Sequence, residues 1–362
     1  MKEKITIKES VRGIIEYILK AGSIDDRYMG ATRAVDGTIA HQKLQSSNEK
    51  LYSNYQKEVR LQEEFEIDNI ILIVDGRADG IIIENNEVYI EEIKSTMKSL
   101  LLIDEDYNEL HWAQAKFYAY IYGIQNALQK INIKLSYFNI ETEEVKSFDK
   151  SFNIEELKDF VFSVINEYKK WVILKSKLIK RRNESIDKLE FPFKSYRKGQ
   201  RELAITCFNA IKEKGVLFAQ APTGIGKTIS TIFPSVKALG QDRGQRIVYL
   251  TAKTITRTVA EEAVGKLKDK GLKCSSITLT AKEKICFKDK ASCNPESCEY
   301  ALNYYDKVND VIFKMIDEED SFTRDTIEKY AKREGLCPFE LSLDLSLWCD
   351  LIICDYNYAF DP

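Results

Sequence analysis

Residues 221–228, with the sequence APTGIGKT, combine glycines, a lysine and a hydroxyl at the spacing that a bound polyphosphate requires. An apolar run at 216–219 predicts a buried strand just before them, and a helical pattern follows. In this setting successive backbone N–H groups and the positive end of the helix dipole point at one anion. Lys227 would reach the β- and γ-phosphates, and the Thr228 hydroxyl would bind Mg²⁺. The sequence therefore predicts a phosphate-binding loop. The alternative is an ordinary glycine-containing turn before a helix.

A second group of reactive residues follows predicted strands nearer the N-terminus. Residues 70–74 and 81–83 are apolar runs that predict two strands, and 76–80 predicts a turn or bulge between them. Two consecutive asparagines at 85–86 predict a hairpin turn into a third strand at 88–94. The carboxylates and the lysine of this region would then lie on neighbouring strands.

Three of these residues suit metal-assisted cleavage of a phosphodiester. Glu92 and Lys94 are two residues apart in a strand, so their side chains share one face. Asp79, at the end of the neighbouring strand, would converge with Glu92 on one divalent cation, while Lys94 positions a water beside it. The alternative for such a pair is a solvated cross-strand ion pair without chemistry.

The order of motifs in this half resembles the RecB-like clan of PD-(D/E)xK nucleases. Residues 76–79 (GRAD) match the acidic motif, and Glu92 with Lys94 matches the motif that follows it. Gly37-x-x-x-His41 resembles the upstream histidine motif, which implies His41 as a further metal ligand. Gln114-x-x-x-Tyr118, in a predicted helix, resembles the downstream motif, which implies that both side chains shape the site and contact DNA. His111 fits no motif and is interpreted as structural.

The C-terminal half resembles superfamily 2 helicases. Their phosphate loop commonly carries alanine where this chain has Ala221, and the resemblance implies nucleotide contacts by the loop residues Ala221, Thr223, Gly224, Gly226, Lys227 and Thr228. Residues 196–200 (YRKGQ) resemble the adenine-recognition element, with Gln200 as the base reader. The alternative for that segment is a plain helix start. A predicted strand at 247–251 resembles the helicase motif that contacts the DNA backbone, here through Thr251 and Lys253.

Four of the eight cysteines form a separate pattern between the phosphate loop and the next acidic motif. They are Cys286, Cys293, Cys298 and Cys337, and the last is followed by proline. Four thiolates in this order can hold a [4Fe–4S] cluster or a structural zinc ion, and the spacing alone leaves both open. Their position resembles the iron–sulfur insertion of XPD/DinG-like helicases, which implies the cluster. The other four, Cys207, Cys274, Cys349 and Cys354, are expected to be core thiols.

An apolar run at 351–354 predicts a buried strand that ends in Asp355, the form of an Mg²⁺-binding acidic motif. In the XPD/DinG family a glutamate follows this aspartate and activates the attacking water. Here the next residue is Tyr356, which leaves the base for ATP hydrolysis unassigned. The chain stops at residue 362, before any second motor lobe with its arginine fingers. We therefore expect the N-terminal portion of a longer protein.

Length and composition indicate two domains of an intracellular protein. The chain has 362 residues, a net charge of −3 and no run of 18 apolar residues or apolar signal core, so we expect no membrane partner and a cytoplasmic location. We predict an α/β protein. A PD-(D/E)xK nuclease fold, a mixed sheet flanked by helices, would occupy residues 1–180. A RecA-like P-loop lobe at 181–362 would carry the iron–sulfur insertion at about 274–340.

These features together predict an ATP-dependent DNA helicase of the XPD/DinG type with a metal-dependent DNA nuclease domain, acting in DNA repair or processing. The implied cofactors are ATP, Mg²⁺ (or Mn²⁺ at the nuclease site) and a [4Fe–4S] cluster. The implied partner is DNA with a single-stranded portion. The alternative is an ATP-dependent DNA-binding or remodelling protein whose nuclease-like domain does not cleave.

Overall fold

The computed structural model describes residues 5–27, 34–252 and 254–360. They divide into two compact units. Of the described residues, unit 1 holds 5–21, 27 and 34–176, and unit 2 holds 22–26 and those from 177 onward. Within the described ranges, no helix is both long and apolar enough to cross a membrane.

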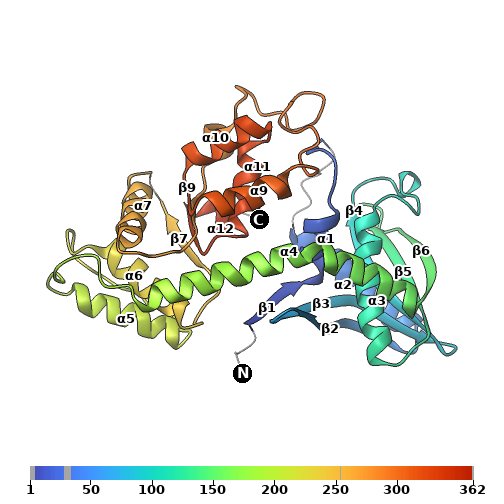
Figure 1. The fold of residues 1–362 in the computed structure, drawn as a ribbon. Coiled ribbons are helices and arrows are strands. Elements are labelled where there is room, and N and C mark those ends of the chain that lie inside the picture. Colours follow the sequence, from blue (N-terminus) through green and yellow to red (C-terminus); the bar gives the residue numbers. More distant parts are fainter. Residues whose placement is uncertain (1–4, 28–33, 253, 361–362) are drawn as a thin grey trace. The chain divides into compact units, whose positions relative to one another are not determined.

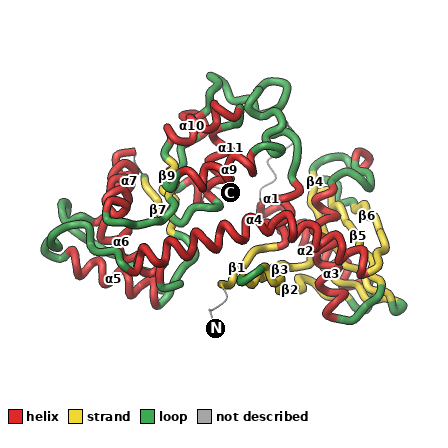
Figure 2. The backbone as a smooth tube through the Cα atoms, viewed as in Figure 1, coloured by secondary structure: helices red, strands yellow, loops and turns green. Residues whose placement is uncertain are grey.

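Unit 1 is a six-stranded mixed sheet with helices packed on it (Figures 1 and 2). Its elements are β1 (Ile5–Ser10), α1 (Val11–Leu19), α2 (Ala34–Leu51), β2 (Tyr55–Ile67), β3 (Ile70–Glu84), β4 (Glu87–Thr96), the 3₁₀ turn η1 (Leu100–Leu102), α3 (Glu109–Gln125), β5 (Lys130–Asn139), β6 (Val145–Asn153) and the first part of α4 (Ile154–Asp187). The hairpin predicted at 85–86 is confirmed, because both asparagines have the positive φ angles, 50° and 65°, that a tight two-residue turn needs.

The turn or bulge predicted at 76–80 is wrong, because β3 runs unbroken through it and keeps one register with β2. β2 pairs along one edge of β3, so β1 and β4 share the other edge, β1 at residues 70–75 and β4 at 80–84. The glycines that suggested a turn instead make room for aromatic rings. A Cβ on Gly76 would lie 2.6 Å from the Tyr118 ring, and one on Gly80 would lie 2.3 Å from the Tyr55 hydroxyl.

Unit 2 is built on a four-stranded parallel sheet of order β7–β10–β8–β9. Its elements after α4 are α5 (Gln200–Lys212), α6 (Lys227–Gly240), β7 (Ile247–Thr251), α7 (Thr254–Asp269), β8 (Ser276–Thr278), α8 (Lys282–Ile285), α9 (Val308–Glu318), β9 (Ser321–Phe322), α10 (Arg324–Glu334), α11 (Pro338–Ser346), β10 (Leu351–Asp355) and α12 (Asn357–Phe360). Apolar residues of α6 and α7, such as Val236 and Leu267, pack against β10 in one core. This parallel α/β arrangement fits a RecA-like fold.

The strand predicted at 216–219 does not form. The segment is loop, and Val216 and Phe218 are 85% and 94% exposed. The sheet runs in the order β7–β10–β8–β9, and the segment pairs with none of these strands, not even the outer ones, β7 and β9. Strand formation depends on tertiary context, so an apolar run alone is not enough to make a strand.

The polar and basic residues 180–185, close to the domain boundary predicted at 180, belong to the last turns of α4. Arg182 is 5% exposed, and its guanidinium donates to Asp350 Oδ1 over 2.7 Å. Asp350 Oδ2 accepts in turn from the N–H and hydroxyl of Ser275, at 3.0 and 2.9 Å. Arg182 therefore anchors the end of α4 to the residues beside β8 and β10 in unit 2.

Candidate functional site

The strands β3 and β4 separate at the predicted acidic pair. Their pairing stops where Gly80 faces Glu91, so Asp79 and Glu92 are the first residues beyond it on each strand. β4 continues beside β5 instead. Asp79 bridges the opening, since its Oδ2 accepts from the N–H of Ile93 over 2.7 Å. We call this opening the β3–β4 fork.

Glu92 is buried in the β3–β4 fork with only half of its carboxylate satisfied. Its side chain is 2% exposed, Oε1 accepts from Lys94 Nζ over 2.7 Å, and Oε2 is buried without a hydrogen-bond partner among the described residues. Burial raises the pKa of Glu92 to about 7, against the lowering effect of Lys94. A buried carboxylate oxygen left open in this way is a candidate ligand for a cation.

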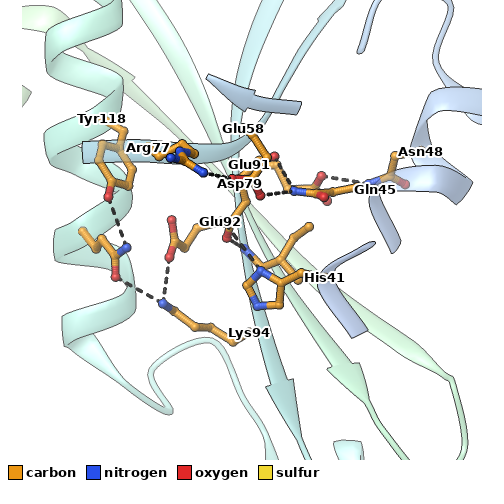
Figure 3. A network of polar contacts seen from close by, with 12 residues as sticks. His41, Gln45, Asn48, Glu58, Arg77, Asp79, Glu91, Glu92, Lys94 and Tyr118 are labelled. Carbon is orange, nitrogen blue, oxygen red and sulfur yellow. Dashed lines mark hydrogen bonds and ion pairs between the residues drawn. The ribbon is translucent and has the colours of Figure 1, made fainter. Parts of the chain in front are cut away.

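His41, on α2, faces the same fork (Figure 3). Its Nδ1 lies 3.5 Å from Asp79 Oδ1. Burial disfavours the charged imidazole, but the hydrogen bond and charge of Asp79 outweigh it and raise the pKa of His41. The histidine and the aspartate come from segments 38 residues apart in the chain, so the fold unites the two motifs that the sequence predicted.

Helix α3 contributes Gln114 and Tyr118, one turn apart. Gln114 Oε1 accepts from Lys94 Nζ over 3.1 Å, and Gln114 Nε2 lies 3.4 Å from the Tyr118 hydroxyl. Burial raises the pKa of Tyr118, which therefore stays a neutral phenol. This chain of contacts fixes the ammonium of Lys94 between Glu92 and the helix.

Four residues that the sequence reasoning missed complete the network in Figure 3 or lie beside it: Gln45, Asn48, Tyr55 and Glu91. Glu91, next to Glu92 in the chain, is fully buried. Gln45 and Asn48 could have been predicted from their spacing, because they follow His41 by four and seven residues and so lie on the same side of a helix.

The fit of this site to a divalent cation rests on its donor set. Carboxylate oxygens and an imidazole are present, and Glu92 offers an open oxygen. In the described part of the chain, however, no group of three His, Cys, Asp or Glu side chains is arranged to hold a metal ion. The donors instead satisfy one another, through the contacts of Asp79 with Ile93 and His41 and of Glu92 with Lys94. Cation binding would exchange these contacts, and the residue types fit it.

His111 is the second histidine of the chain, and it lies outside this donor set. Its Nδ1 is 2.9 Å from the hydroxyl of Tyr137. Burial, with added repulsion from Lys94 and Arg12, lowers the pKa of His111 to about 3. It is a neutral, hydrogen-bonded histidine, which agrees with the structural role expected for it.

The predicted phosphate loop ends where α6 begins, at Lys227. Gly224 and Gly226 have φ angles of 81° and 83°, which glycine adopts without strain. The Lys227 ammonium donates to the carbonyls of Ala221 and Pro222, at 3.0 and 3.2 Å. The lysine thus folds over its own loop, where a phosphate would offer it better acceptors.

Gln200, at the start of α5, lies directly against this loop. A Cβ on Gly226 would be 2.5 Å from Gln200 Nε2, and Gln200 Oε1 accepts from the N–H of Arg197 over 2.9 Å. A cavity of about 440 Å³ opens beside them and is also lined by Phe193 and Thr228. The cavity joins the predicted base reader and the predicted Mg²⁺ ligand in one space.

The remaining helicase-like residues occupy the carboxyl ends of neighbouring strands. Asp355 ends β10 and faces Thr251 of β7 in register. The Thr251 hydroxyl is buried and donates to the Cys354 carbonyl over 3.3 Å, while Asp355 accepts from the N–H of Asn357 over 3.1 Å. Lys253 lies outside the described residues.

The four patterned cysteines lie between β8 and the start of α11, in a part of unit 2 that has long loops. Figure 2 shows loops next to α9, α10 and α11. Cys286 follows α8, and Cys337 is the N-cap of α11. The Cys293 carbonyl accepts from the N–H of Asp26 over 2.9 Å, so the segment 22–26 packs onto this stretch. Burial raises the pKa of Cys337 to about 11, and Cys293 adds to this rise.

In the described residues these thiols form no metal-binding group, as noted above. The cysteines expected to be core thiols, Cys207, Cys274, Cys349 and Cys354, are all buried, which confirms that prediction.

Comparison with known proteins identifies one segment of the chain. Residues 201–336 match the family model for the DEAD/DEAH box helicase. That segment of the chain is therefore similar to this helicase family. The matched segment begins at α5 and includes the phosphate loop, and it reaches the residue before Cys337.

Two curated relatives are helicase subunits. The "General transcription and DNA repair factor IIH helicase subunit XPD" of Arabidopsis thaliana is 22% identical over 213 residues, covering 48% of this chain and 27% of the relative. The XPD/RAD3 subunit of Saccharomyces cerevisiae is 30% identical over 131 residues, covering 35% of this chain and 16% of the relative. The chain thus spans about a quarter and a sixth of these relatives. A solved XPD helicase is 16% identical, covers 47% of this chain and 29% of its own, and has a TM-score of 0.33, too low to support an argument.

Proposed function

We propose that this chain combines a metal-dependent DNA nuclease in unit 1 with the nucleotide-binding lobe of an XPD-type, ATP-dependent DNA helicase in unit 2. The observation that carries the nuclease is the β3–β4 fork. There a buried carboxylate with one open oxygen, Glu92, lies with Asp79, His41 and Lys94. Structural ion pairs seldom leave a fully buried carboxylate oxygen unsatisfied, because its desolvation costs about 1 to 3 kcal/mol.

In this proposal Asp79, Glu92 and His41 would hold one divalent cation. A bound Mg²⁺ or Mn²⁺ supplies Lewis-acid polarisation of the phosphodiester and a more acidic water. Lys94, held by Gln114, places a positive charge where charge develops on the phosphate. Tyr118 is neutral and only 3% exposed, so it would shape the site through its contact with Gln114. Each role uses a side chain of the predicted set.

The helicase half of the proposal is supported by the family match and by the cavity at the phosphate loop. Gln200 would read the adenine edge, Lys227 would bind the β- and γ-phosphates, and Thr228 with Asp355 would hold Mg²⁺. Thr251 and Lys253 are proposed contacts to the DNA backbone. DNA with a single-stranded portion is the proposed substrate.

Cys286, Cys293, Cys298 and Cys337 would hold the [4Fe–4S] cluster. All four residues are free thiols in one stretch of unit 2, which fits the donor chemistry of such a cluster. Cluster binding requires thiolates, so it would displace the thiol protons, including that of Cys337, whose pKa burial raises. The cluster's proposed role is structural.

A nicking assay tests the nuclease against the non-cleaving alternative. Supercoiled plasmid and 5′-labelled single-stranded DNA are incubated with the full chain and Mn²⁺, Mg²⁺ or EDTA, without ATP. The proposal predicts strand breaks with either metal and none with EDTA. Metal-dependent DNA binding without breaks would instead favour the alternative, a DNA-binding platform in unit 1.

A further inference from the structure

Helix α2 turns polar side chains toward the sheet. His41, Gln45 and Asn48 are spaced i, i+4 and i+7, which places them on one side of a helix. Gln45 and Asn48 are buried, at 3% and 6% exposed. The apolar residues Ala40 and Leu44 lie beside them and join a small core. A buried stripe of this kind is normally apolar, so its two amides need a reason.

Both amides bind the sheet at the β3–β4 fork (Figure 3). Gln45 Nε2 donates to the backbone carbonyl of Asp79 over 2.9 Å and to Glu58 Oε1 over 2.8 Å. Asn48 Nδ2 donates to Glu91 Oε2 over 2.8 Å. One amide thus contacts a member of the acidic pair through its main chain, and the other contacts the residue next to the second member.

Glu91, the acceptor for Asn48, is itself held firmly in place. Its carboxylate is fully buried and accepts from three elements: α2 through Asn48, β2 through the Tyr55 hydroxyl at 2.9 Å, and β5 through the Ser136 hydroxyl at 2.7 Å. Glu91 occupies the last paired position of β4 before Glu92. The contacts of Glu91 therefore tie the position of α2 to the residues at which β3 and β4 separate.

Energetics favour a geometric role for these amides. A satisfied buried hydrogen bond contributes only about 0.5 to 1.5 kcal/mol net, and an apolar residue of similar shape is often equally stable. Polar contacts do, however, select one position of a helix over others, because each donor must meet its acceptor. Stability alone therefore does not account for Gln45 and Asn48.

We propose that Gln45 and Asn48 are positioning residues that lock α2 onto β3 and β4 so that His41 faces Asp79. This inference rests on the proposed nuclease function of the fork. What the inference states directly is the position of the His41 imidazole, which can be measured without a cleavage assay.

The test uses the full chain labelled with ¹³C-histidine, which contains only two histidines, His41 and His111. The variants are Gln45→Met and Asn48→Leu, and the matched control is Asn132→Leu. Asn132 is also a buried amide of unit 1, 7% exposed, but it lies on β5 and bonds Ser151. We expect the His41 ring resonances to move in both variants and the His111 resonances to stay, with neither set of resonances moving in the control.

A second readout is Mn²⁺ affinity, which we expect to fall about tenfold or more in the two variants, as for other residues that orient metal ligands. High Mn²⁺ should then restore part of the cleavage rate. Tyr55→Phe, which removes one donor to Glu91 and leaves no cavity, should act in the same direction if the larger changes unfold the protein.

Unmoved His41 resonances in folded Gln45→Met and Asn48→Leu protein would overturn the inference, and so would equal movement in the Asn132→Leu control. The parent protein could prove neither to bind Mn²⁺ nor to cut DNA, which would overturn the proposed nuclease function. Movement of the His41 resonances in the two variants would still support the positioning role of Gln45 and Asn48 in that case.

Discussion

The ammonium of Lys94 lies 2.7 Å from the Oε1 atom of Glu92, two residues earlier on the same strand. Side chains two apart on a strand share a face, so the contact follows from local geometry. What is not local is the burial: Glu92 is 2% exposed, while Lys94 retains access to solvent at 22%. Lys94 can therefore contact a bound substrate. At the same time it partly neutralises the carboxylate of Glu92, which is buried out of the substrate's reach.

The burial of Glu92 predicts a pH dependence of stability in the absence of metal. The pKa is about 7 in the folded chain and about 4.3 in an unfolded one. Below pH 4 both forms are protonated and no penalty exists. As pH rises from 4.3 to 7 the unfolded chain loses its proton first, so the free energy of unfolding falls, and above pH 7 the penalty is complete.

Urea denaturation in EDTA of the parent and Glu92→Gln measures this effect. From pH 5 to pH 8 the parent should lose about 2 to 3 kcal/mol relative to the variant, which cannot ionise at this position. Parallel pH profiles for the two proteins would show that Glu92 titrates normally.

Lys227 is predicted to control nucleotide affinity without affecting the fold. Among the described residues its ammonium bonds two carbonyls of its own loop, so Lys227→Ala should leave the melting temperature unchanged. The affinity for a fluorescent ATP analogue with Mg²⁺ should fall at least tenfold, because a charge-assisted phosphate contact is lost. Lys212→Ala, an exposed lysine of α5, is the control. Equal affinities of the parent, Lys227→Ala and Lys212→Ala for the ATP analogue would contradict the phosphate-binding role of this loop.

The patterned cysteines are predicted to bind iron. Protein purified without oxygen should be brown and contain iron and sulfide in near-equal amounts, and Cys298→Ser should lose most of both. Cys207→Ala should keep them, since Cys207 is a buried thiol outside the pattern. Zinc in place of iron, in cells with ample iron, would contradict the cluster and leave a structural zinc site.

The buried pair of Arg182 and Asp350 is predicted to stabilise unit 2. Asp350→Ala strands a guanidinium that is 6% exposed, so we expect a loss of about 3 kcal/mol or more in the free energy of unfolding. Asp320→Ala removes a more exposed partner, which bonds Lys268, and should cost less, about 1 kcal/mol. A smaller loss for Asp350→Ala than for Asp320→Ala would contradict this account.

The sequence predicted those features of the site that depend on local spacing. Alternation placed Glu92 and Lys94 on one face, and two asparagines marked the hairpin before them. The glycines of β3 were misread as a turn because Gly76 and Gly80 serve aromatic rings, from Tyr118 and Tyr55, that lie far away in the sequence. Space required by residues so distant in the sequence cannot be predicted from the local sequence pattern.

A further error has a similar physical origin. The apolar run at 216–219 was expected to be a strand, but it is loop and pairs with none of the four strands of the unit 2 sheet. Tertiary context outweighed local propensity there. The amides of α2 were missed because their acceptors are set by the fold.

The central claim is that Asp79 belongs to a metal-dependent nuclease site, and matched variants on one strand test it most directly. Asp79→Ala is compared with Asp75→Ala, which removes another carboxylate of β3 that pairs with Lys8 and Arg60 outside the fork. The measurement is the initial rate of Mn²⁺-dependent cleavage of labelled DNA by folded protein. We predict a loss of at least about 100-fold for Asp79→Ala, comparable to other single catalytic groups, and a near-parental rate for Asp75→Ala. Cleavage by Asp79→Ala at the parental rate would contradict the account.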